Sequence, residues 1–425
     1  MDNNIAIQTY GCTNNFSESE VMAGLLKKAG FKIVKKENAD MIILNICTVK
    51  GNKKAFDVIE EAKKLNKKII LAGCIPKESY KEFRKILPDA CFISTHNIKN
   101  IVEIVEEARN DSVIDLMTHS NDVKINLPKI RHNKHIGIVP ILSGCNNKCS
   151  YCSVKLVKGE LFSFPKENII REAEKCLRDR CRELWITSMD NAAYGMELGK
   201  PMLPDLLKNV LKIQGDFKVR LGMMNPSNLL PILDEMIEIY KHDKMYKFLH
   251  IPVQSGNNEI LKSMNRKYKV EEFLKIIDVF ESEIPDITIS TDIICGFPGE
   301  TDEQFEESVD LIKEIKPDIL NISRFIPRSR TRAYYMENQI HGNITKERSR
   351  ILTDIHNNIS RLNNEKWRGW KGEVMVSEKK EDWVARNYAY KPIVIKSSED
   401  LLGKEVKVKV IKTYPHYLIG EIINI

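Results

Sequence analysis

Three cysteines near the middle of the chain have the spacing of metal ligands. They lie in the segment Ser143–Cys152, where Cys145, Cys149 and Cys152 form a Cys-x3-Cys-x2-Cys pattern. A closed structural zinc site takes four protein ligands, and a simple electron-transfer iron–sulfur cluster is held by four cysteines. Three thiolates on a four-iron cluster leave one iron open to bind and activate another molecule. The spacing therefore favours a reactive cluster, and the alternative is a zinc site completed by a distant fourth ligand.

The region from residue 1 to about residue 118 alternates predicted strands with predicted helices. The expected strands are Asn4–Tyr10, Asp40–Ile46 and Lys68–Ala72, and the expected helices are Ser17–Ala29, Lys53–Leu65 and Ser79–Leu87. This alternation is typical of a parallel sheet with helices packed against it. The pattern therefore predicts an α/β domain with a doubly wound parallel sheet.

Each of those three strands is followed by a cysteine. Cys12, Cys47 and Cys74 stand at successive strand ends, although they are far apart in the sequence. Ligands bind outside the carboxyl ends of the strands in open α/β sheets, so these cysteines can converge. Free cysteine is often a small buried residue, and packing is the alternative for any one of them. The repeated placement favours a shared site, whereas Cys91 lacks the same context and is interpreted as core.

The region from about residue 131 to residue 362 contains six predicted strands separated by amphipathic helices. The expected strands are His135–Leu142, Leu184–Ser188, Lys218–Met224, Lys247–Val253, Thr288–Ile294 and Asp318–Phe325. The expected helices include Lys166–Cys181, Leu203–Ile213, Val270–Glu281 and Glu303–Ile315. Six strand–helix units predict a partial (β/α)6 parallel barrel, smaller than the eight-unit form.

Residues typical of binding loops follow all six barrel strands. The three-cysteine segment follows the first strand, and the other strands are followed by Met189–Asn191, Asn225–Ser227, Gln254–Gly256, Gly296–Thr301 and Pro327–Arg332. Barrel active sites lie at the C-terminal ends of the strands, so we expect the site on these loops. Cys176 and Cys181 are interpreted as packing residues, whereas Cys295 is expected at the active rim.

The last region, from about residue 365 to residue 425, changes to short alternating segments. The expected strands are Glu373–Val376, Lys391–Ile395, Glu405–Ile411 and Tyr417–Ile422. Together they predict a small, largely antiparallel β-barrel. Tryptophans and tyrosines are interleaved with lysines and arginines here, which suits single-stranded or looped RNA because phosphates meet charge and bases stack on rings. The alternative is a solvated face with core aromatics.

Overall composition bounds the kind of protein. The 425 residues include 66 Lys and Arg against 59 Asp and Glu, and the formal net charge of +7 weakly favours an anionic partner such as nucleic acid. The polar N-terminus has no secretion signal, and no apolar run is long enough to cross a membrane. We therefore expect a cytoplasmic protein whose ten cysteines are reduced and available as metal ligands or catalytic groups.

Several longer motifs resemble those of the radical SAM methylthiotransferases, and the likeness covers nearly the whole chain. Besides the three-cysteine segment, they are Gly11–Glu20, Asn45–Val49, Gly73–Cys74, His250–Gly256 and Thr291–Thr301. The first fits the family pattern Gly-Cys-x-x-Asn-x-x-Asp-Ser-Glu, with Glu18 in place of the aspartate. The resemblance implies a cluster-binding domain over residues 1–118, a radical SAM core over 131–362 and a C-terminal TRAM domain over 365–425.

The same resemblance implies two 4Fe–4S clusters and S-adenosylmethionine as cofactors. Cys145, Cys149 and Cys152 would hold the first cluster, whose open iron chelates S-adenosylmethionine and leads to a 5′-deoxyadenosyl radical. The second would be held by Cys12, Cys47 and Cys74 and would carry the sulfur that becomes the methylthio group. One S-adenosylmethionine would methylate that sulfur and another would supply the radical.

Further contacts are expected around these centres. The predicted contacts to S-adenosylmethionine are Tyr151, Ser188, Asn225, Gln254, Gly296, Phe297, Pro298 and Gly299. The predicted contacts to RNA are Arg328, Arg330, Arg368, Lys371, Arg386 and Lys391.

The segment Trp185–Gly195 is similar to the archaeal and eukaryotic branch of the family. That branch acts on N6-threonylcarbamoyladenosine at position 37, beside the tRNA anticodon. It usually has Glu where this chain has Met189, and the usual Pro-Arg-Pro-Gly-Thr appears as Pro327–Thr331 with Arg330 at the glycine position. The implied partners are tRNA, a sulfur donor and a low-potential electron donor.

Two other functions fit parts of the sequence. A protein-directed methylthiotransferase shares this architecture but modifies a ribosomal protein side chain. An RNA-binding protein with structural metal sites would have no enzymatic activity. The basic, aromatic-rich last region and the loop after the second barrel strand favour RNA over a protein substrate. Iron and sulfide content distinguishes the enzyme from the RNA-binding protein, because about eight irons per chain support the enzyme and one or two zincs the binder.

Overall fold

Six parallel strands form the N-terminal sheet of the computed structural model, which describes residues 3–48 and 53–423. Val49, part of one family motif, lies outside the described residues. The strands are β1 (Asn4–Tyr10), β2 (Lys32–Ile33), β3 (Met41–Cys47), β4 (Lys68–Cys74), β5 (Cys91–Ser94) and β6 (Asp115–Leu116). Their order is β2-β1-β3-β4-β5-β6, so the order reverses between β1 and β3. This reversal is the point where open α/β sheets bind ligands.

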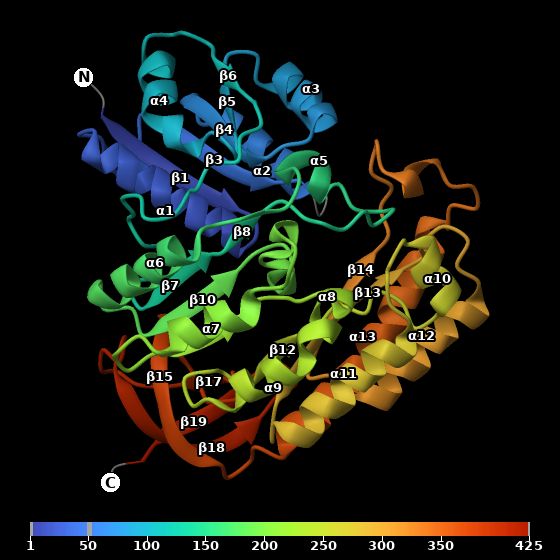
Figure 1. The fold of residues 1–425 in the computed structure, drawn as a ribbon. Helices are drawn as coiled ribbons and strands as arrows, with labels where there is room; N and C mark the ends of the chain where they lie inside the picture. Colours follow the sequence, from blue (N-terminus) through green and yellow to red (C-terminus); the bar gives the residue numbers. More distant parts are fainter. Residues whose placement is uncertain (1–2, 49–52, 424–425) are drawn as a thin grey trace.

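Helices cover both faces of this sheet (Figure 1). On one face lie α1 (Thr13–Lys28) and α4 (Ile101–Arg109), and on the other lie α2 (Lys53–Lys63) and α3 (Lys77–Ile86). Successive residues of β3 face opposite cores: Ile43 packs with α1 and α4, whereas Ile42 packs with α2 and α3. A strand buried on both faces reads as a continuous apolar run. The predicted doubly wound domain is confirmed.

The central region forms a partial barrel of six strands in chain order. They are β7 (Ile136–Pro140), β10 (Glu183–Thr187), β11 (Lys218–Leu221), β12 (Phe248–His250), β13 (Thr288–Cys295) and β14 (Ile319–Arg324). The strands pair in parallel as β7-β10-β11 and β12-β13-β14, and a parallel bridge between Val219 and Met245 joins the two groups. The predicted (β/α)6 barrel is confirmed.

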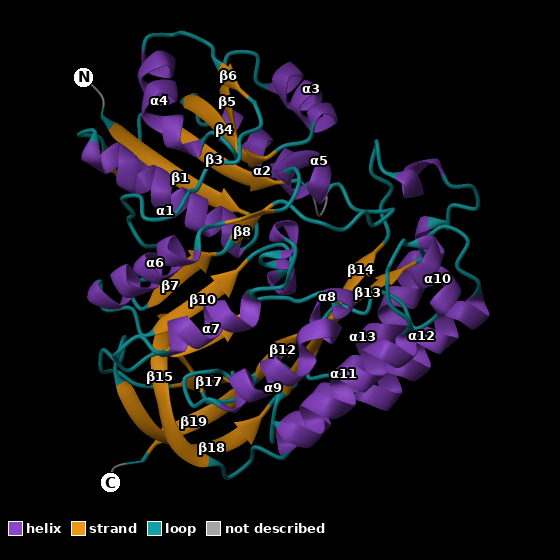
Figure 2. Ribbon diagram, viewed as in Figure 1, coloured by secondary structure: helices purple, strands orange, loops and turns teal. Residues whose placement is uncertain are grey.

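Helices form the outer layer of this barrel, as Figure 2 shows. They are α6 (Lys166–Arg178), α7 (Leu203–Leu211), α8 (Pro226–Leu229), α9 (Leu233–Lys241), α10 (Asn258–Ser263), α11 (Val270–Glu283), α12 (Asp302–Ile315) and α13 (Gly342–Glu365), whereas the short helix α5 (Val154–Lys158) lies against the N-terminal domain. A short antiparallel pair, β8 (Leu142–Ser143) and β9 (Phe162–Ser163), flanks the first cysteine loop. The domain boundary expected at residue 362 falls inside α13, because this helix continues from the barrel into the last region.

Short 3-10 turns complete the helical elements. They are η1 (Lys36–Asn38), η2 (Ile98–Asn100), η3 (Asn191–Ala193), η4 (Met196–Leu198), η5 (Leu230–Ile232) and η6 (Arg332–Tyr335). Within the described ranges, no helix combines the length and the apolar character needed to cross a membrane.

A closed five-stranded barrel forms the C-terminal region. Its strands are β15 (Lys371–Lys379), β16 (Trp383–Arg386), β17 (Pro392–Ile395), β18 (Glu405–Thr413) and β19 (Leu418–Ile422), in the order β15-β16-β17-β19-β18. The pair β17–β19 is parallel and the others are antiparallel. The predicted small β-barrel is confirmed, although the sequence did not predict β16.

The loop between β16 and β17 docks at the N-terminal ends of the (β/α)6 strands, opposite the cysteine loops. Lys247 donates its backbone N–H to the carbonyl oxygen of Tyr388 at 2.8 Å, and Thr288 Oγ1 donates to the carbonyl oxygen of Ala389 at 2.7 Å. The Tyr390 ring lies 5.0 Å from that of Phe248. The C-terminal barrel thus covers the base of the central barrel and leaves the cysteine end open.

Candidate active site at the two cysteine loops

The first cysteine set lies on one loop after β8. Cys145, Cys149 and Cys152 are all partly exposed. The backbone N–H of Cys152 donates to the carbonyl oxygen of Cys149 at 3.2 Å, and that of Asn147 donates to Cys145 Sγ at 3.4 Å. Burial raises the pKa of Cys145 to about 11 and that of Cys152 to about 12. Thiols of this kind ionise when a metal centre coordinates them, so the donor set fits an iron–sulfur cluster.

Two glycines allow the tight turns beside the cysteines. Gly144 has φ +73°, and a Cβ there would lie 1.8 Å from the carbonyl oxygen of Glu160. Gly73 has φ +109°, and a Cβ there would lie 2.3 Å from the carbonyl oxygen of Ile46. Only glycine accepts both the left-handed backbone and the close approach.

Arg266 connects the first cysteine loop to the barrel, and the sequence did not single it out. Its Nη1 donates to Cys149 Sγ at 3.4 Å, and its Nη2 donates to Asn225 Oδ1 at 3.3 Å. The guanidinium also stacks 4.9 Å from the Tyr268 ring centroid. A cation in hydrogen-bond contact with a thiol stabilises the thiolate that a cluster requires. Arg266 follows α10 rather than a strand end, which is why strand-end reasoning missed it.

The loop after β13 carries four of the predicted cofactor contacts. Gly296 and Gly299 have φ +75° and +82°. Phe297 is buried between them and meets the Tyr151 ring edge-to-face, with 6.5 Å between centroids. Tyr151 comes from the cysteine loop, so this contact brings the loop and the end of β13 together. Cys295 ends β13 at this rim, as expected, and its side chain is buried in the core.

The remaining predicted cofactor contacts follow β10, β11 and β12. Ser188 and Asn225 are buried, and the backbone N–H of Asn225 donates to Asp190 Oδ1 at 3.0 Å. Gln254 has φ +77° and donates its backbone N–H to the carbonyl oxygen of Asp292 at 2.8 Å. Strained non-glycine residues of this kind cluster at functional sites. All three lie at the cysteine end of the barrel, and their binding role stays a prediction.

The second cysteine set lies at the carboxyl ends of β1, β3 and β4. Cys47 and Cys74 are opposite each other in the β3–β4 register, and Cys12 directly precedes α1. A hydrogen bond with Cys47, together with burial, raises the pKa of Cys74 well above its usual value. Asn15 links the set, because its Nδ2 donates to Cys74 Sγ at 3.8 Å and its Oδ1 accepts from Cys12 Sγ at 3.4 Å. The structure therefore brings together three cysteines that are far apart in sequence.

Arg328 lies between the two cysteine sets. Its Nη1 donates to the carbonyl oxygen of Thr48, and its charge acts on both Cys47 and Cys152. Burial lowers the pKa of Arg328. This residue was predicted to bind RNA, and the structure places it at the site where the cysteine loops meet.

Two other predicted RNA contacts, Arg386 and Lys391, are instead engaged in internal ion pairs. Lys391 is buried, and its Nζ donates to Asp318 Oδ1 at 2.6 Å. The guanidinium of Arg386 pairs with Glu378 at 2.5 Å. Both cations are turned inward to satisfy carboxylates, so neither is free to meet a phosphate.

The other three predicted RNA contacts are exposed. Arg330 has φ +66°, the left-handed conformation that the family's usual glycine adopts readily. Arg368 pairs with Glu365, and Lys371 begins β15. These three side chains can reach a phosphate from the surface.

The number of thiolates in each cysteine set fits a four-iron cluster with one open iron, because each set offers three where a simple electron-transfer cluster takes four. Within the described ranges, no three His, Cys, Asp or Glu side chains are gathered closely enough to hold a single metal ion.

A parallel partial barrel with a Cys-x3-Cys-x2-Cys loop at its strand ends corresponds to the domain described as the Radical SAM superfamily, which matches residues 139–312. The domain described as Uncharacterized protein family UPF0004 matches residues 4–94, and the TRAM domain matches residues 373–423. Among solved structures, the radical S-adenosylmethionine methyltransferase TsrM from Kitasatospora setae superposes with a TM-score of 0.55 and 12% identity, covering 79% of this chain and 77% of that one. This likeness concerns the fold alone.

Full-length relatives define the family more narrowly. A probable threonylcarbamoyladenosine tRNA methylthiotransferase of Archaeoglobus fulgidus is 40% identical, with 98% of each chain covered. One from Pyrococcus horikoshii is 38% identical, with 99% of each chain covered. The threonylcarbamoyladenosine tRNA methylthiotransferase of Homo sapiens is 36% identical over 98% of this chain and 73% of the human protein. The chain belongs to the threonylcarbamoyladenosine tRNA methylthiotransferase family.

Proposed function

We propose that this chain transfers a methylthio group to carbon 2 of N6-threonylcarbamoyladenosine at position 37 of tRNA. The observation that carries the proposal is that the charge of Arg328 acts on both three-cysteine sets, one at the barrel strand ends and one at the switch point of the N-terminal sheet. The names of the full-length relatives support the substrate. Ten free cysteines suit a reducing compartment, and we place the enzyme in the cytoplasm.

Each cysteine set would hold one 4Fe–4S cluster. Cys145, Cys149 and Cys152 would bind the first, and Cys12, Cys47 and Cys74 the second. When bound, the clusters and S-adenosylmethionine supply the radical and sulfur-transfer chemistry. The protein holds the thiolates, orients the reactants and limits access of water.

Different side chains have different roles in holding the clusters and the substrate. Arg266 donates to Cys149 Sγ and stabilises the thiolate form. Arg328 places a cation between the two sets, where it offsets negative charge from both. The loop at Tyr388–Tyr390 covers the opposite end of the barrel, so substrate approaches from the cysteine end. Arg330, Arg368 and Lys371 remain on the surface as contacts for the tRNA backbone.

The proposal is tested by separating the two chemistries. With Cys74→Ala, the purified chain should still cleave S-adenosylmethionine, whereas formation of the 2-methylthio nucleoside should be lost. Cys91→Ala is the matched control, because Cys91 is a buried cysteine of the same sheet that packs in the core. Methylthiolation that survives in Cys74→Ala would reject the second-cluster assignment, and modification of a ribosomal protein instead of tRNA would reject the substrate.

A further inference from the structure

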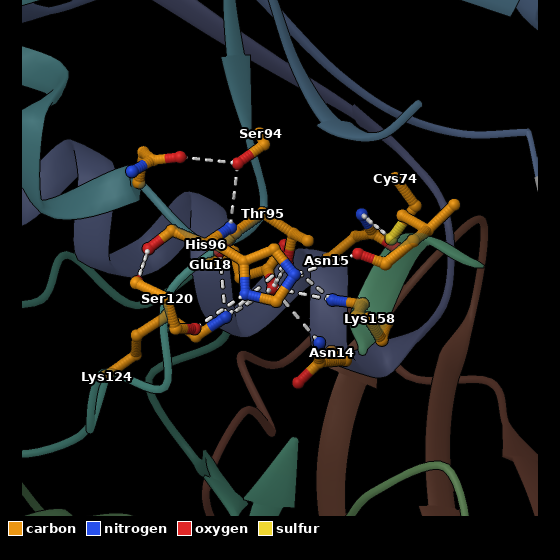
Figure 3. Close-up of polar contacts among 12 residues, drawn as sticks. Asn14, Asn15, Glu18, Cys74, Ser94, Thr95, His96, Ser120, Lys124 and Lys158 are labelled. Atoms are coloured by element: carbon orange, nitrogen blue, oxygen red, sulfur yellow. Dashed lines mark hydrogen bonds and ion pairs between the residues drawn. The ribbon is translucent and has the colours of Figure 1, made fainter. Parts of the chain in front are cut away.

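A buried ion-pair network joins the two cysteine loops (Figure 3). Its centre is Glu18 on α1, which is 4% exposed. Glu18 Oε1 accepts from Lys158 Nζ at 2.8 Å and from Asn14 Nδ2 at 3.1 Å, and Lys124 Nζ lies 3.5 Å away. Thr95 Oγ1 donates to the same oxygen. Buried charged groups are costly unless they are paired, so these ion pairs and hydrogen bonds stabilise the interface.

The network ties together the segments that leave the two cysteine sets. Lys158 ends α5, a helix that begins two residues after Cys152. Glu18 lies in the second turn of α1, which begins directly after Cys12. The Lys158–Glu18 pair therefore fixes the first cysteine loop against the N-terminal domain. Lys124, from the segment between the two domains, closes the network from a third side.

The buried charges do not cancel within the network. Lys124 and Lys158 bring two positive charges, and Glu18 brings one negative charge. His96 adds no negative charge: burial lowers its pKa, whereas the carbonyl oxygens of Ser120 and Val157, each 2.8 Å from one ring nitrogen, accept only from N–H and so favour the protonated ring. At least one positive charge is therefore left over among these groups, and a buried surplus charge is costly unless an anion lies nearby.

The surplus charge faces the second cysteine set. Figure 3 places the Lys158 side chain beside Asn15 and Cys74. A small cavity of about 20 Å³ runs from Glu18, Lys124 and Lys158 to Gly144 and Met189. The Lys158 charge also interacts with Cys74 and Cys12, so thiolates at these positions are anions that a bound cluster would add beside it. Three thiolates on an oxidised four-iron cluster leave a net negative charge, which reduction increases.

We propose that Lys158 is a positioning residue that fixes the separation of the two cysteine loops through Glu18 and, with Lys124, balances the negative charge of the cluster held by Cys12, Cys47 and Cys74. This inference rests on the proposed second cluster. Net charge and nearby cations set the reduction potential of an iron–sulfur cluster. Removing the Lys158 charge therefore makes reduction of the second cluster harder and shifts its potential in the negative direction.

The test isolates the second cluster. In the full-length chain, Cys145, Cys149 and Cys152 are all replaced by alanine, and the reconstituted protein is titrated with dithionite while electron paramagnetic resonance reports the reduced cluster. At a solution potential that reduces half of the parent clusters, Lys158→Met should lower the ratio of reduced to oxidised cluster by about tenfold, the size expected for one charge at roughly 10 Å. Lys158→Arg should restore the parent value.

Two further variants keep the result interpretable. Lys129 and Glu172 form a comparably buried ion pair outside the network, with 2.6 Å between Nζ and Oε1 and side chains 1% and 0% exposed. Lys129→Met breaks this pair. It should leave the potential unchanged. Met189→Glu adds a carboxylate to the cavity without removing a lysine and should shift the potential in the same direction as Lys158→Met. An unchanged potential in Lys158→Met and Met189→Glu, or an equal shift in Lys129→Met, would overturn the charge-balancing role.

The positioning role has its own readout. In the chain with both clusters reduced, pulsed electron paramagnetic resonance measures the distribution of distances between the two clusters. Lys158→Met should broaden this distribution, and Lys158→Arg should restore the parent distribution. An unchanged distance distribution overturns that part of the proposal. If the parent chain binds about four irons instead of about eight, the second cluster and this inference are both rejected. Eight irons without methylthiolation reject only the proposed reaction, and the potentials remain a valid test.

Discussion

At the scale of single residues, Asn15 positions cysteines of the second set through its side-chain hydrogen bonds. Its side chain is fully buried and bridges Cys12 and Cys74, and its Nδ2 also donates to Asn45 Oδ1 at 3.1 Å. Asn45 returns a hydrogen bond from Nδ2 to the Asn15 carbonyl oxygen at 2.8 Å. An amide can donate and accept at once, as Asn15 does when it accepts from Cys12 and donates to Cys74. An apolar residue of similar size would leave these partners unsatisfied.

Asn15→Leu should therefore reduce the iron content from about eight to about four per chain, because only the first cysteine set stays in place. S-adenosylmethionine cleavage should persist, since its loop is on a different domain. Iron and sulfide analysis after anaerobic reconstitution measures this. Full iron content in Asn15→Leu would mean that the amide does not organise the second set.

Arg330 is the residue that departs most visibly from the family turn. Its φ of +66° strains an L-amino acid by roughly 1–2 kcal/mol, whereas glycine adopts this conformation freely. Arg330→Gly is expected to raise the free energy of unfolding by about 0.5–1 kcal/mol and to weaken tRNA binding. Denaturant unfolding and binding titrations at several salt concentrations measure the two effects. Weaker binding with a smaller salt dependence supports a phosphate contact, and unchanged binding contradicts it.

At the scale of elements, helix α1 connects Cys12 of the second cysteine set to helix α5, which follows the first set. It begins after Cys12, packs its apolar residues on the sheet and presents Glu18 to Lys158 of α5. Burial by itself would raise the pKa of Glu18, but the charges of Lys158 and Lys124 and the hydrogen bonds from Lys158 and Thr95 lower it. Burial also lowers the pKa of Lys124 to about 8. The carboxylate thus stays ionised at neutral pH and holds two elements together.

Glu18→Gln should destabilise the metal-free chain by about 3–5 kcal/mol at pH 7, because two buried lysines lose their counter-charge. The folded-state pKa of Glu18 is lowered, so its contribution is complete above the unfolded value near 4.5 and is lost as the pH falls through the folded value. The difference between parent and variant should therefore shrink below pH 4.5. Urea unfolding across pH measures it, and an equal difference at every pH would contradict the ionised pair.

Much of the arrangement of elements could be predicted from the sequence, because residues that follow parallel strands lie together at one edge of a sheet or barrel. The apolar run Met41–Cys47 indicates a strand buried on both faces, and its last residue then falls at the switch point of the sheet. The strand β16 was missed because its first three residues, Trp383–Ala385, are buried in succession and show no apolar–polar alternation. Arg386 and Lys391 were misinterpreted because a sequence does not show which cations pair with buried carboxylates. Arg266 lies on a helix-to-helix loop, so no strand-end signal identified it.

At the scale of the whole molecule, two domains meet at the site and a third closes the far end of the central barrel. The N-terminal sheet brings the second cysteine set to the first, and the C-terminal barrel covers the far end of the central barrel (Figure 1). Tyr390 is the central contact of this cover, with its ring 4.9 Å from that of Tyr246 and 5.0 Å from that of Phe248. The domain that resembles an RNA-binding module therefore also supports the barrel.

Tyr390→Ala should lower the free energy of unfolding by about 3 kcal/mol and make the C-terminal barrel more sensitive to proteolysis. Its matched control is Tyr417→Ala, a tyrosine on the exposed face of the same barrel, which should cost less than 1 kcal/mol by rough expectation. Denaturant unfolding and limited proteolysis measure both. Equal losses in the two variants would show that the Tyr390 contact does not support the central barrel.

The central claim is that two cysteine-held centres act together on one tRNA nucleoside. Its most direct test is mass spectrometry of tRNA nucleosides from a host that makes N6-threonylcarbamoyladenosine but lacks its own methylthiotransferase. Expression of the parent chain should produce the 2-methylthio derivative, whereas Cys74→Ala and Cys149→Ala should each leave the nucleoside unmodified. A 2-methylthio product formed by either variant, or none formed by the parent chain with both clusters present, would contradict the account.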